Sequence, residues 1–286
     1  MKLATVKVNG EEAAAIISDN QAILMQTINE LESKDWSTDL FQILQKEQLT
    51  EINLWYKEEG QKKLRHFPHI SDENISYAPL YRSSRKILGV GMNYLEKAIE
   101  LSGKPPEEEP VIFMKPDTSL IGPEEVIKLP SQFGKVTAEA ELGIIIGKTC
   151  KNVKEQDAYS VVAGFTTTLD MTAKDIHAKN PRYLQRSKSF DTFFSFGPYF
   201  ITADEFPEIK DLTVETVLNG EVHHHNVVAN MIYPPEWIVS FFSHIMTLYP
   251  GDIIMTGTPG SVVIRDGDVV ECHIDRFKSL QNPVSV

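Results

Sequence analysis

The sequence has few cysteines, no long apolar run and no excess of basic residues. Among its 286 residues are only two cysteines, Cys150 and Cys272, which are too few and too isolated for a disulfide framework or a thiolate metal site. We expect both to be free structural thiols. Residues 1–8 lack the apolar core of a signal peptide, and no run of about 18 apolar residues occurs to span a bilayer. These absences predict a cytoplasmic protein without a membrane-spanning segment.

The charge balance is strongly acidic. Lys and Arg number 28 against 40 Asp and Glu, which gives a formal net charge of −12. Nucleic acids and anionic membrane surfaces bind basic patches, so neither is an expected partner. An anionic small molecule would need local Lys or Arg side chains, or a bound cation, to offset the general field.

Length and local patterning predict a small N-terminal domain followed by a larger one, at roughly 100 to 200 residues per domain. Residues 2–8 alternate apolar and polar side chains before Asn9-Gly10, which indicates a β-hairpin. Residues 23–49 have the apolar spacing of a helix. A proline-marked stretch then precedes the next apolar strand. We therefore place a small α+β domain at 1–80 and a second domain at 81–286.

The second domain is mainly strand-like from residue 111. Long helical spacers of βαβ units are mostly missing, so a mixed or antiparallel sheet folded on itself is favoured over a doubly wound parallel sheet. The predicted fold class is α+β and mostly β. Before these strands, 94–101 is expected to form a short helix and 103–110 an exposed loop, so that 93–110 is a candidate lid. The predicted strands are 111–114, 142–146, 161–169, 212–218, 253–256 and 269–274.

Two glutamates separated by one alanine enter an apolar strand. Residues i and i+2 of a strand point to one face, so Glu139 and Glu141 would project together. Two adjacent buried carboxylates are costly unless a cation lies between them, and Asp170, at the end of another apolar strand, is a candidate third ligand. Carboxylate oxygens suit Mg²⁺ or Mn²⁺, and the lack of nearby His or Cys argues against zinc or copper. An isolated Glu-x-Glu is, however, more often a solvated strand face.

Three further segments contain side chains that suit an anionic ligand or a metal. Lys115 and Lys188 each lie beside bulky apolar residues, where an ammonium can bind an anion, although an ordinary surface lysine is the commoner outcome. The glycine-rich turn around Thr258 offers a hydroxyl and backbone N–H groups to a carboxylate, with a purely structural turn as an equal alternative. The histidine run 223–225 follows an Asn-Gly turn, and we expect it to lie on a solvent-exposed strand.

Taken in order, these segments resemble the fumarylacetoacetate hydrolase family, in its shorter bacterial form with a small N-terminal domain. The resemblance covers most of residues 86–286. Each matching piece is common by itself, but eight pieces in this order are highly specific. They are GVGMNY (89–94), FMKP (113–116), EAEL (139–142), LDMTAKD (169–175), KSFD (188–191), GP (197–198), NGE (219–221) and GDIIMTGTP (251–259).

The resemblance implies a fold, a metal and a class of substrate. It implies a C-terminal mixed β-roll in which Glu139, Glu141 and Asp170 bind Mg²⁺ or Mn²⁺, usually in a homodimer, and it maps Lys188 and Thr258 onto substrate-contacting positions. Family substrates are small anionic 2-oxo acids such as acylpyruvates, fumarylacetoacetate-like diketo acids and oxaloacetate. A 2-oxo acid can chelate the ion through its carboxylate and keto oxygens. The ion then stabilises the enolate left when the adjacent C–C bond breaks.

Two departures from the family pattern concern the chemistry. Family hydrolases have a histidine three residues before a glutamate on the lid helix, and that pair activates the attacking water. Here Lys97 stands where the histidine is expected, and Glu100 remains. A lysine with its usual pKa of about 10.4 is protonated at neutral pH and is a poor base unless it is strongly desolvated. Lys174 replaces the usual arginine, so a bidentate clamp becomes a point charge, and His177 replaces a frequent glutamine.

The favoured hypothesis is a metal-dependent enzyme that cleaves a C–C bond in a small 2-oxo acid, as a hydrolase or as a decarboxylase. Decarboxylation needs no activated water, and Lys97 could donate the proton or bind a distal carboxylate. Hydrolysis remains open if Glu100 alone acts as the base, and enol–keto isomerisation would use the same enolate. The alternative is a family member that has lost catalysis and only binds a metal and a 2-oxo acid. The catalytic candidates are Glu100, Lys97 and Lys188, and the substrate-binding candidates are Lys174, His177 and Thr258.

Overall fold

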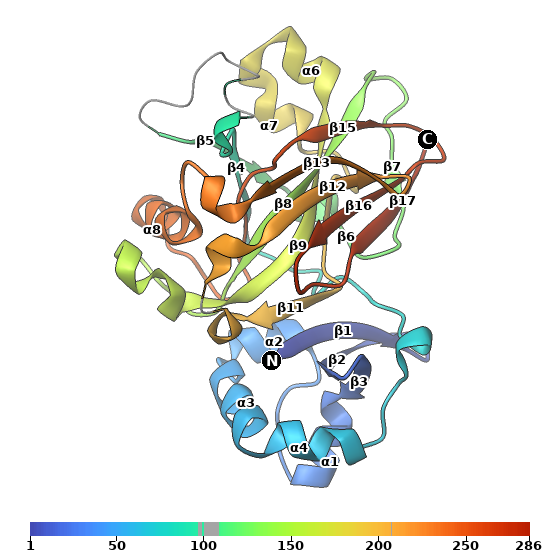
Figure 1. Cartoon of the computed structure of the whole chain (residues 1–286), viewed down its shortest axis with the longest axis vertical. Helices are drawn as coiled ribbons and strands as arrows, with labels where there is room; N and C mark the ends of the chain where they lie inside the picture. The colour runs from blue at the N-terminus through green and yellow to red at the C-terminus, as the bar shows by residue number, and fades with distance from the viewer. Residues whose placement is uncertain (97–98, 100–108, 207) are drawn as a thin grey trace.

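The structure is a computed structural model that describes residues 1–96, 99, 109–206 and 208–286. The first part of the chain (blue in Figure 1) begins with a β-hairpin. Asn9 and Gly10 at its tip both have positive φ angles, 52° and 85°, as a two-residue hairpin turn requires, so the predicted hairpin is confirmed. The elements of this part are β1 (Lys2–Val8), β2 (Glu11–Ser18), β3 (Gln21–Leu24), α1 (Met25–Glu32), α2 (Leu40–Gln45), α3 (Leu49–Trp55) and α4 (Gln61–Lys63).

The continuous helical pattern predicted for 23–49 is divided in the structure. Ile23 belongs to β3, and the first helix ends at Ser33, whose φ of 52° is left-handed. A second helix starts after Asp39, whose side chain accepts a hydrogen bond of 2.7 Å from the Gln42 N–H. An aspartate in this position caps the free N–H groups of a helix and favours a new start. None of the helices in the described ranges is long and apolar enough to cross a lipid bilayer.

The remainder of the chain is dominated by strands, so the predicted mixed, mostly β fold is confirmed. Most neighbouring strands are antiparallel, while β14 with β4, β10 with β6 and β17 with β7 are parallel. The strands are β4 (Ile87–Gly91), β5 (Val111–Lys115), β6 (Leu120–Ile121), β7 (Ile127–Lys128), β8 (Val136–Ile146), β9 (Val162–Ala173), β10 (Phe194–Phe196), β11 (Tyr199–Thr202), β12 (Thr213–Leu218), β13 (Glu221–Val227), β14 (Ile253–Met255), β15 (Ser261–Ile264), β16 (Val269–Ile274) and β17 (Leu280–Ser285). The helices are α6 (Lys174–Lys179), α7 (Leu184–Ser187) and α8 (Pro235–Ile245).

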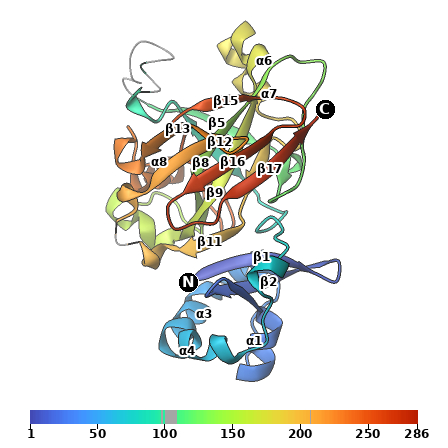
Figure 2. The same ribbon diagram turned by 45° about the vertical axis from the view of Figure 1, so that its right-hand side comes forward.

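The strands form two sheets. A 12-stranded sheet has the order β3-β2-β1-β11-β9-β8-β14-β4-β5 with β6, β10 and β15 attached, and a 5-stranded sheet has the order β13-β12-β16-β17-β7. The N-terminal hairpin continues the larger sheet because Lys2 of β1 pairs with Ile201 of β11, and both ribbon views place β11 next to β1 (Figures 1 and 2). The division at residue 80 therefore stays a prediction, since hydrogen bonds cross it.

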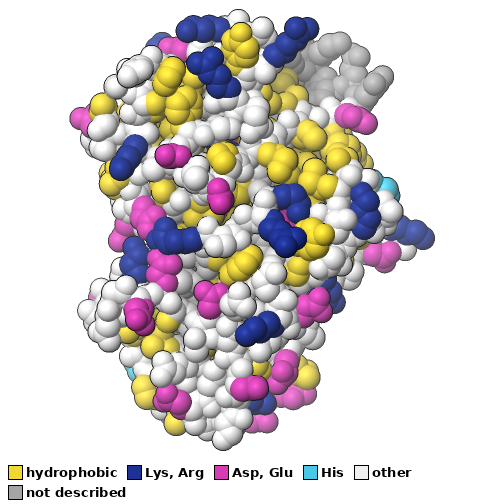
Figure 3. Space-filling view, turned by 180° about the vertical axis from the view of Figure 1, so that it is seen from behind, with side chains coloured by type: hydrophobic (Ala, Val, Ile, Leu, Met, Phe, Trp, Pro, Cys, Tyr) yellow, Lys and Arg dark blue, Asp and Glu magenta, His cyan; other side chains and the backbone are white. Residues whose placement is uncertain are grey.

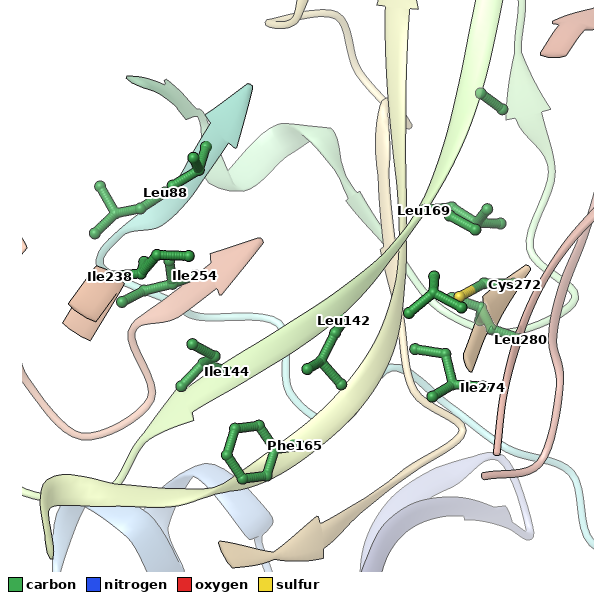
Figure 4. Close-up of a cluster of buried hydrophobic side chains, with 14 of the residues drawn as sticks. Leu88, Leu142, Ile144, Phe165, Leu169, Ile238, Ile254, Cys272, Ile274 and Leu280 are labelled. Carbon is green, nitrogen blue, oxygen red and sulfur yellow. The ribbon is translucent and has the colours of Figure 1, made fainter. Parts of the chain in front are cut away.

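The pair β8–β9 is packed on both faces. On one face, Leu142 and Leu169 lie against Cys272 and Leu280 of the 5-stranded sheet (Figure 4). Cys150 and Cys272 are both free and buried, as expected. Because side chains alternate along a strand, the odd-numbered residues of β8 point to the opposite face. The apolar packing of the even-numbered residues thus fixes the direction of Glu139 and its neighbours.

On the face drawn in Figure 3, the described surface has no broad region of a single charge sign. Basic and acidic side chains are intermixed there, with apolar side chains between them.

The turn before β14 is a close contact with the N-terminal part of the chain. Gln45 of α2 donates a hydrogen bond of 2.6 Å to the Pro250 carbonyl. A Cβ on Gly251 would lie 2.5 Å from the Phe41 ring, and Gly251 has φ +85°. Glycine is therefore required here both by the backbone angle and by the neighbouring ring.

We expect Gly251→Ala to lower the free energy of unfolding more than Gly267→Ala does. Gly267 has nearly the same φ, +84°, but open space where its Cβ would be, so its variant measures the backbone penalty alone, about 1–3 kcal/mol. The clash with Phe41 should add a further ~1–3 kcal/mol. Urea unfolding of both variants measures the difference, and equal losses would mean that Phe41 moves away without cost.

Candidate metal centre

Three carboxylates meet on one face of β8 and β9, the face opposite to the one packed against the 5-stranded sheet. Glu139 pairs directly with Asp170 across the two antiparallel strands, and Glu141 lies two residues further along the same face of β8. Each of the three offers an oxygen, and these oxygens lie within 4.8 Å of one another. In the described part of the chain, no other group of three or more His, Cys, Asp or Glu side chains has this geometry. The strand register thus brings together the trio expected from the sequence.

Burial makes the trio electrostatically expensive without a cation. Asp170 is 0% exposed and Glu141 is 2% exposed, while Glu139 is partly buried. Burial raises the pKa of Glu141 well above its usual range, and the negative charges of Asp170 and Glu139 raise it further. The Gly257 N–H donates a hydrogen bond of 2.6 Å to Glu141 Oε2 and opposes this shift. A divalent cation among the three carboxylates would remove the repulsion that this pKa reflects.

Two buried lysines neutralise part of this charge through Asp170. Lys188 Nζ is hydrogen-bonded to Asp170 Oδ2, and it donates to Glu139 Oε2 at 3.1 Å and to Thr172 Oγ1 at 2.8 Å. Burial alone would lower the pKa of Lys188, but the carboxylates of Asp170 and Glu139 raise it above its usual value. The ammonium therefore stays charged at neutral pH and is suited to binding an anion.

The second lysine, Lys115, lies on the other side of Asp170. Its Nζ is 2.7 Å from Asp170 Oδ1, and it donates hydrogen bonds to the carbonyl oxygens of Met171 (3.0 Å) and Lys188 (2.8 Å). Burial lowers its pKa to about 8, although Asp170 opposes the shift. Sequence reasoning named Lys115 only as an anion-binding candidate or a surface lysine. The signal for its burial is Phe113, since i and i+2 share a face of β5 and both side chains point inward.

The turn that follows β14 borders the trio. Thr258 is buried, and its hydroxyl donates to the Gly260 carbonyl (2.9 Å) and accepts from the Gly260 N–H (3.1 Å). Gly257, next to it, provides the N–H that contacts Glu141. The turn is internally hydrogen-bonded, as the structural alternative expects, and it also contacts the acidic centre. Binding of a substrate carboxylate by Thr258 stays a prediction. The sequence pattern indicated Thr258 but not Gly257, whose contact with Glu141 is made by a backbone N–H group.

The short helix α6 follows β9 directly and brings His177 near the trio. Burial lowers the pKa of His177, and the positive charge of Lys188 lowers it further while Glu139 opposes the shift. The imidazole is therefore neutral at pH 7 and offers one hydrogen-bond donor and one acceptor. Lys174 at the start of the same helix is exposed. Its substrate-binding role stays a prediction, as does that of His177.

The lid candidates are only partly within the described residues. Lys97 and Glu100 lie outside them, so their catalytic roles stay predictions. Asn93, at the start of the predicted lid, is buried, and its side-chain amide donates to the carbonyl oxygens of Tyr233 (2.9 Å) and Thr256 (2.7 Å). These bonds fix the beginning of that segment beside the turn that contacts Glu141.

The histidine run lies on β13, as predicted, but its three members differ in direction. His223 and His225 are exposed, whereas His224 is partly buried. The middle histidine was not expected to point inward.

Comparison with known proteins shows that this chain is similar to a family of enzymes. A model of the fumarylacetoacetate (FAA) hydrolase C-terminal domain matches residues 86–285. Oxaloacetate tautomerase fahd2, mitochondrial, of Xenopus laevis is 35% identical over 75% of this chain and 70% of its own length.

Two solved structures are similar over the whole chain. The 5-carboxymethyl-2-hydroxymuconate delta-isomerase of Mycobacterium smegmatis has a TM-score of 0.77 at 28% identity, covering 100% of this chain and 98% of that one. The maleylpyruvate hydrolase of Sphingobium sp. SYK-6, in complex with manganese(II) and pyruvate, has a TM-score of 0.81 at 25% identity, covering 100% and 99%. The relatives thus include a tautomerase, an isomerase and a hydrolase, one of them with a divalent metal bound.

Proposed function

This chain belongs to the fumarylacetoacetate hydrolase family, and from that premise we propose that it is a divalent-metal-dependent enzyme acting on a small anionic 2-oxo acid. The proposed ligands of the metal, Mg²⁺ or Mn²⁺, are Glu139, Glu141 and Asp170. The observation that supports this most strongly is their convergence within 4.8 Å with two of the three buried. We also propose, from the family resemblance, a homodimer in the cytoplasm.

The donor set and the charge both fit such an ion. Carboxylate oxygens are the ligands that Mg²⁺ and Mn²⁺ prefer. When all are ionised, the trio and its two lysines, Lys115 and Lys188, leave one net negative charge in a buried site. A divalent cation would change this to one net positive charge, which complements the carboxylate of a 2-oxo acid. An uncharged ketone would lack this charge–charge attraction, so the charge of the site favours an acid.

The residues around the trio have separate proposed roles. A bound Mg²⁺ or Mn²⁺ supplies a Lewis acid that polarises the keto oxygen and stabilises the negative charge of an enolate. Lys188, charged and held by Asp170 and Glu139, attracts the substrate carboxylate. The Thr258 hydroxyl and the neutral imidazole of His177 are suited to orient the acid by hydrogen bonds. Lys174 is proposed to attract a second, distal carboxylate as a point charge.

We propose that the C–C bond that breaks joins C3 to C4 of the 2-oxo acid, one carbon away from the 2-keto group, by decarboxylation or by hydrolysis. Its cleavage leaves the enolate of the 2-keto group. Lys97 stands at the lid position where family hydrolases have histidine. This favours a reaction that needs no activated water, and we propose Lys97 as its proton donor. Hydrolysis requires Glu100 to act as base on its own. A second candidate function is keto–enol tautomerisation, which the similarity to the Xenopus laevis oxaloacetate tautomerase favours. It needs the same enolate and a proton donor, but no bond between carbons breaks.

Turnover of a panel of 2-oxo acids tests the proposal. We expect the Mn²⁺-loaded chain to act on at least one of oxaloacetate, acetylpyruvate and fumarylpyruvate, and we expect a chelator to reduce that rate by about 10²-fold or more, with recovery on adding Mn²⁺. Release of CO₂ identifies a decarboxylase, and release of a second carboxylic acid identifies a hydrolase. Accelerated loss of the enol absorbance with all carbons retained identifies a tautomerase.

Two results would count against the proposal in different ways. Metal-dependent binding of these acids without turnover supports the alternative of a family member that binds but does not catalyse. Turnover that is unaffected by complete removal of divalent metal would contradict the assigned role of the trio.

A further inference from the structure

The histidine run on β13 has one member whose ring packs against the turn bordering the metal centre. His224 pairs with Thr216 of β12, so both side chains point to the same, inner side of the 5-stranded sheet. A Cβ built on Gly260 would lie 2.2 Å from Cγ of His224 and 2.4 Å from its Nδ1. The imidazole therefore occupies the space that any side chain at position 260 would need.

The backbone of Gly260 is hydrogen-bonded both to the turn before it and to β12. Its carbonyl oxygen accepts hydrogen bonds from the hydroxyls of Thr258 and Thr216, each at 2.9 Å, and its N–H donates to Thr258 Oγ1 at 3.1 Å. Thr216 Oγ1 also accepts a hydrogen bond of 3.2 Å from the Ala140 N–H, between the two glutamates of β8. Hydrogen bonds thus hold the peptide groups of Gly260, and the His224 ring covers its Cα.

Both ends of the turn are attached to the glutamates of the acidic centre. The Gly257 N–H contacts Glu141, and Ser261 at the start of β15 pairs with Glu139. Among the described residues, the middle of the turn, which includes Thr258, has no backbone pairing of this kind. Its position depends on Thr216 and on the ring that lies against Gly260.

We propose that His224 is a positioning residue for the substrate side of this centre. Its ring supports Gly260 from behind and so holds the Thr258 hydroxyl in the orientation in which it meets the 2-oxo acid. The role rests on the proposed function, since it acts through Thr258, and it explains why a glycine is needed at position 260. His223 and His225 are exposed to solvent and serve as comparisons on the same strand.

The test compares the three histidines in the Mn²⁺-loaded full chain, with the acid that the panel identifies. We expect His224→Ala to raise KM by about threefold to tenfold with a smaller change in kcat, because a displaced binding group loses part of its contact with the substrate. The dissociation constant of Mn²⁺ should stay within about twofold, because the Gly257–Glu141 hydrogen bond does not involve the ring. His223→Ala and His225→Ala, on the same strand, should leave KM unchanged.

A double-variant cycle isolates the contact itself. Gly260→Ala places a methyl group where the ring lies and should raise KM and lower the melting temperature. Adding His224→Ala makes room for that methyl group. The double variant should therefore have a lower KM and a higher melting temperature than Gly260→Ala alone. Residues in direct contact are expected to depart from additivity in this way. If His224→Ala does not fold, Gly260→Ala alone displaces the turn from the other side and is expected to give the same rise in KM.

Three outcomes would overturn the role of His224. They are a KM for His224→Ala equal to that of His223→Ala, strictly additive effects in the double variant, or a loss of Mn²⁺ affinity as large as the change in KM. In each case a wild-type chain that binds Mn²⁺ and turns over the acid leaves the proposed function intact. A wild-type chain that does neither overturns the proposed function and this role together.

Discussion

Replacing Glu141 with glutamine is expected to abolish metal-dependent turnover. We expect a loss of about 10³-fold or more in kcat/KM and a matching loss of Mn²⁺ affinity, since even a change outside the ligand set of a metal typically costs about 10–100-fold. Glutamine keeps the size of the side chain and an oxygen for the Gly257 N–H, so the variant removes mainly the negative charge. Manganese titration followed by steady-state kinetics measures both losses.

The folding of this variant provides its own control. The pKa of Glu141 is raised in the folded, metal-free chain, so the fold favours the protonated carboxyl. The stability that this form contributes is lost as pH rises through the folded-state pKa. Glutamine resembles the neutral form, so the metal-free variant should melt no lower than the metal-free wild type at pH 7. Glu215→Gln, on the outer face of the 5-stranded sheet, should leave activity unchanged. Unaltered Mn²⁺ affinity in Glu141→Gln would show that the ligand assignment is wrong.

Asp170→Asn is expected to remove both metal binding and a large part of the folding stability. The Lys115 side chain is 0% exposed and has its ammonium 2.7 Å from Asp170, and Lys188 Nζ is hydrogen-bonded to the other oxygen. Asparagine would leave the two buried ammonium groups without this counter-charge. Removing one partner of a buried ion pair costs about 3–5 kcal/mol, which urea unfolding of the metal-free protein would measure.

The double variant Asp170→Asn/Lys115→Met distinguishes this explanation from a general effect on β9. Methionine is similar in length to lysine and uncharged, so the double variant should recover part of the lost stability and none of the Mn²⁺ affinity. Equal stability of Asp170→Asn and wild type would contradict the view that Asp170 balances the charge of the two lysines.

The sequence identified the strands and the acidic trio because both depend on local rules. The apolar runs 142–146 and 163–169 indicate buried strands, and the i,i+2 spacing then directs Glu139 and Glu141 to one side. Asp170 was a candidate third ligand because it ends another apolar strand, and the register of β8 with β9 placed it opposite Glu139. Asn9-Gly10 likewise specified its hairpin through backbone angles alone.

The features missed by sequence reasoning depend on contacts between distant segments. The pairing of β1 with β11 joins residues about two hundred positions apart, and no local pattern predicts it. The burial of Lys115 follows from the pairing of β5 with β4 and from the position of Asp170. His224 points inward because β13 pairs with β12 in one particular register, and a shift of one residue would exchange it with its exposed neighbours.

Calorimetric titration of Mn²⁺ into the chelator-treated chain, with and without pyruvate, tests the central claim most directly. We expect one Mn²⁺ per chain, bound more tightly when pyruvate is present, and by linkage pyruvate bound more tightly when Mn²⁺ is present. Absence of Mn²⁺ binding, or pyruvate binding of equal strength with and without the ion, would contradict the proposal that the acidic trio holds a metal for a 2-oxo acid.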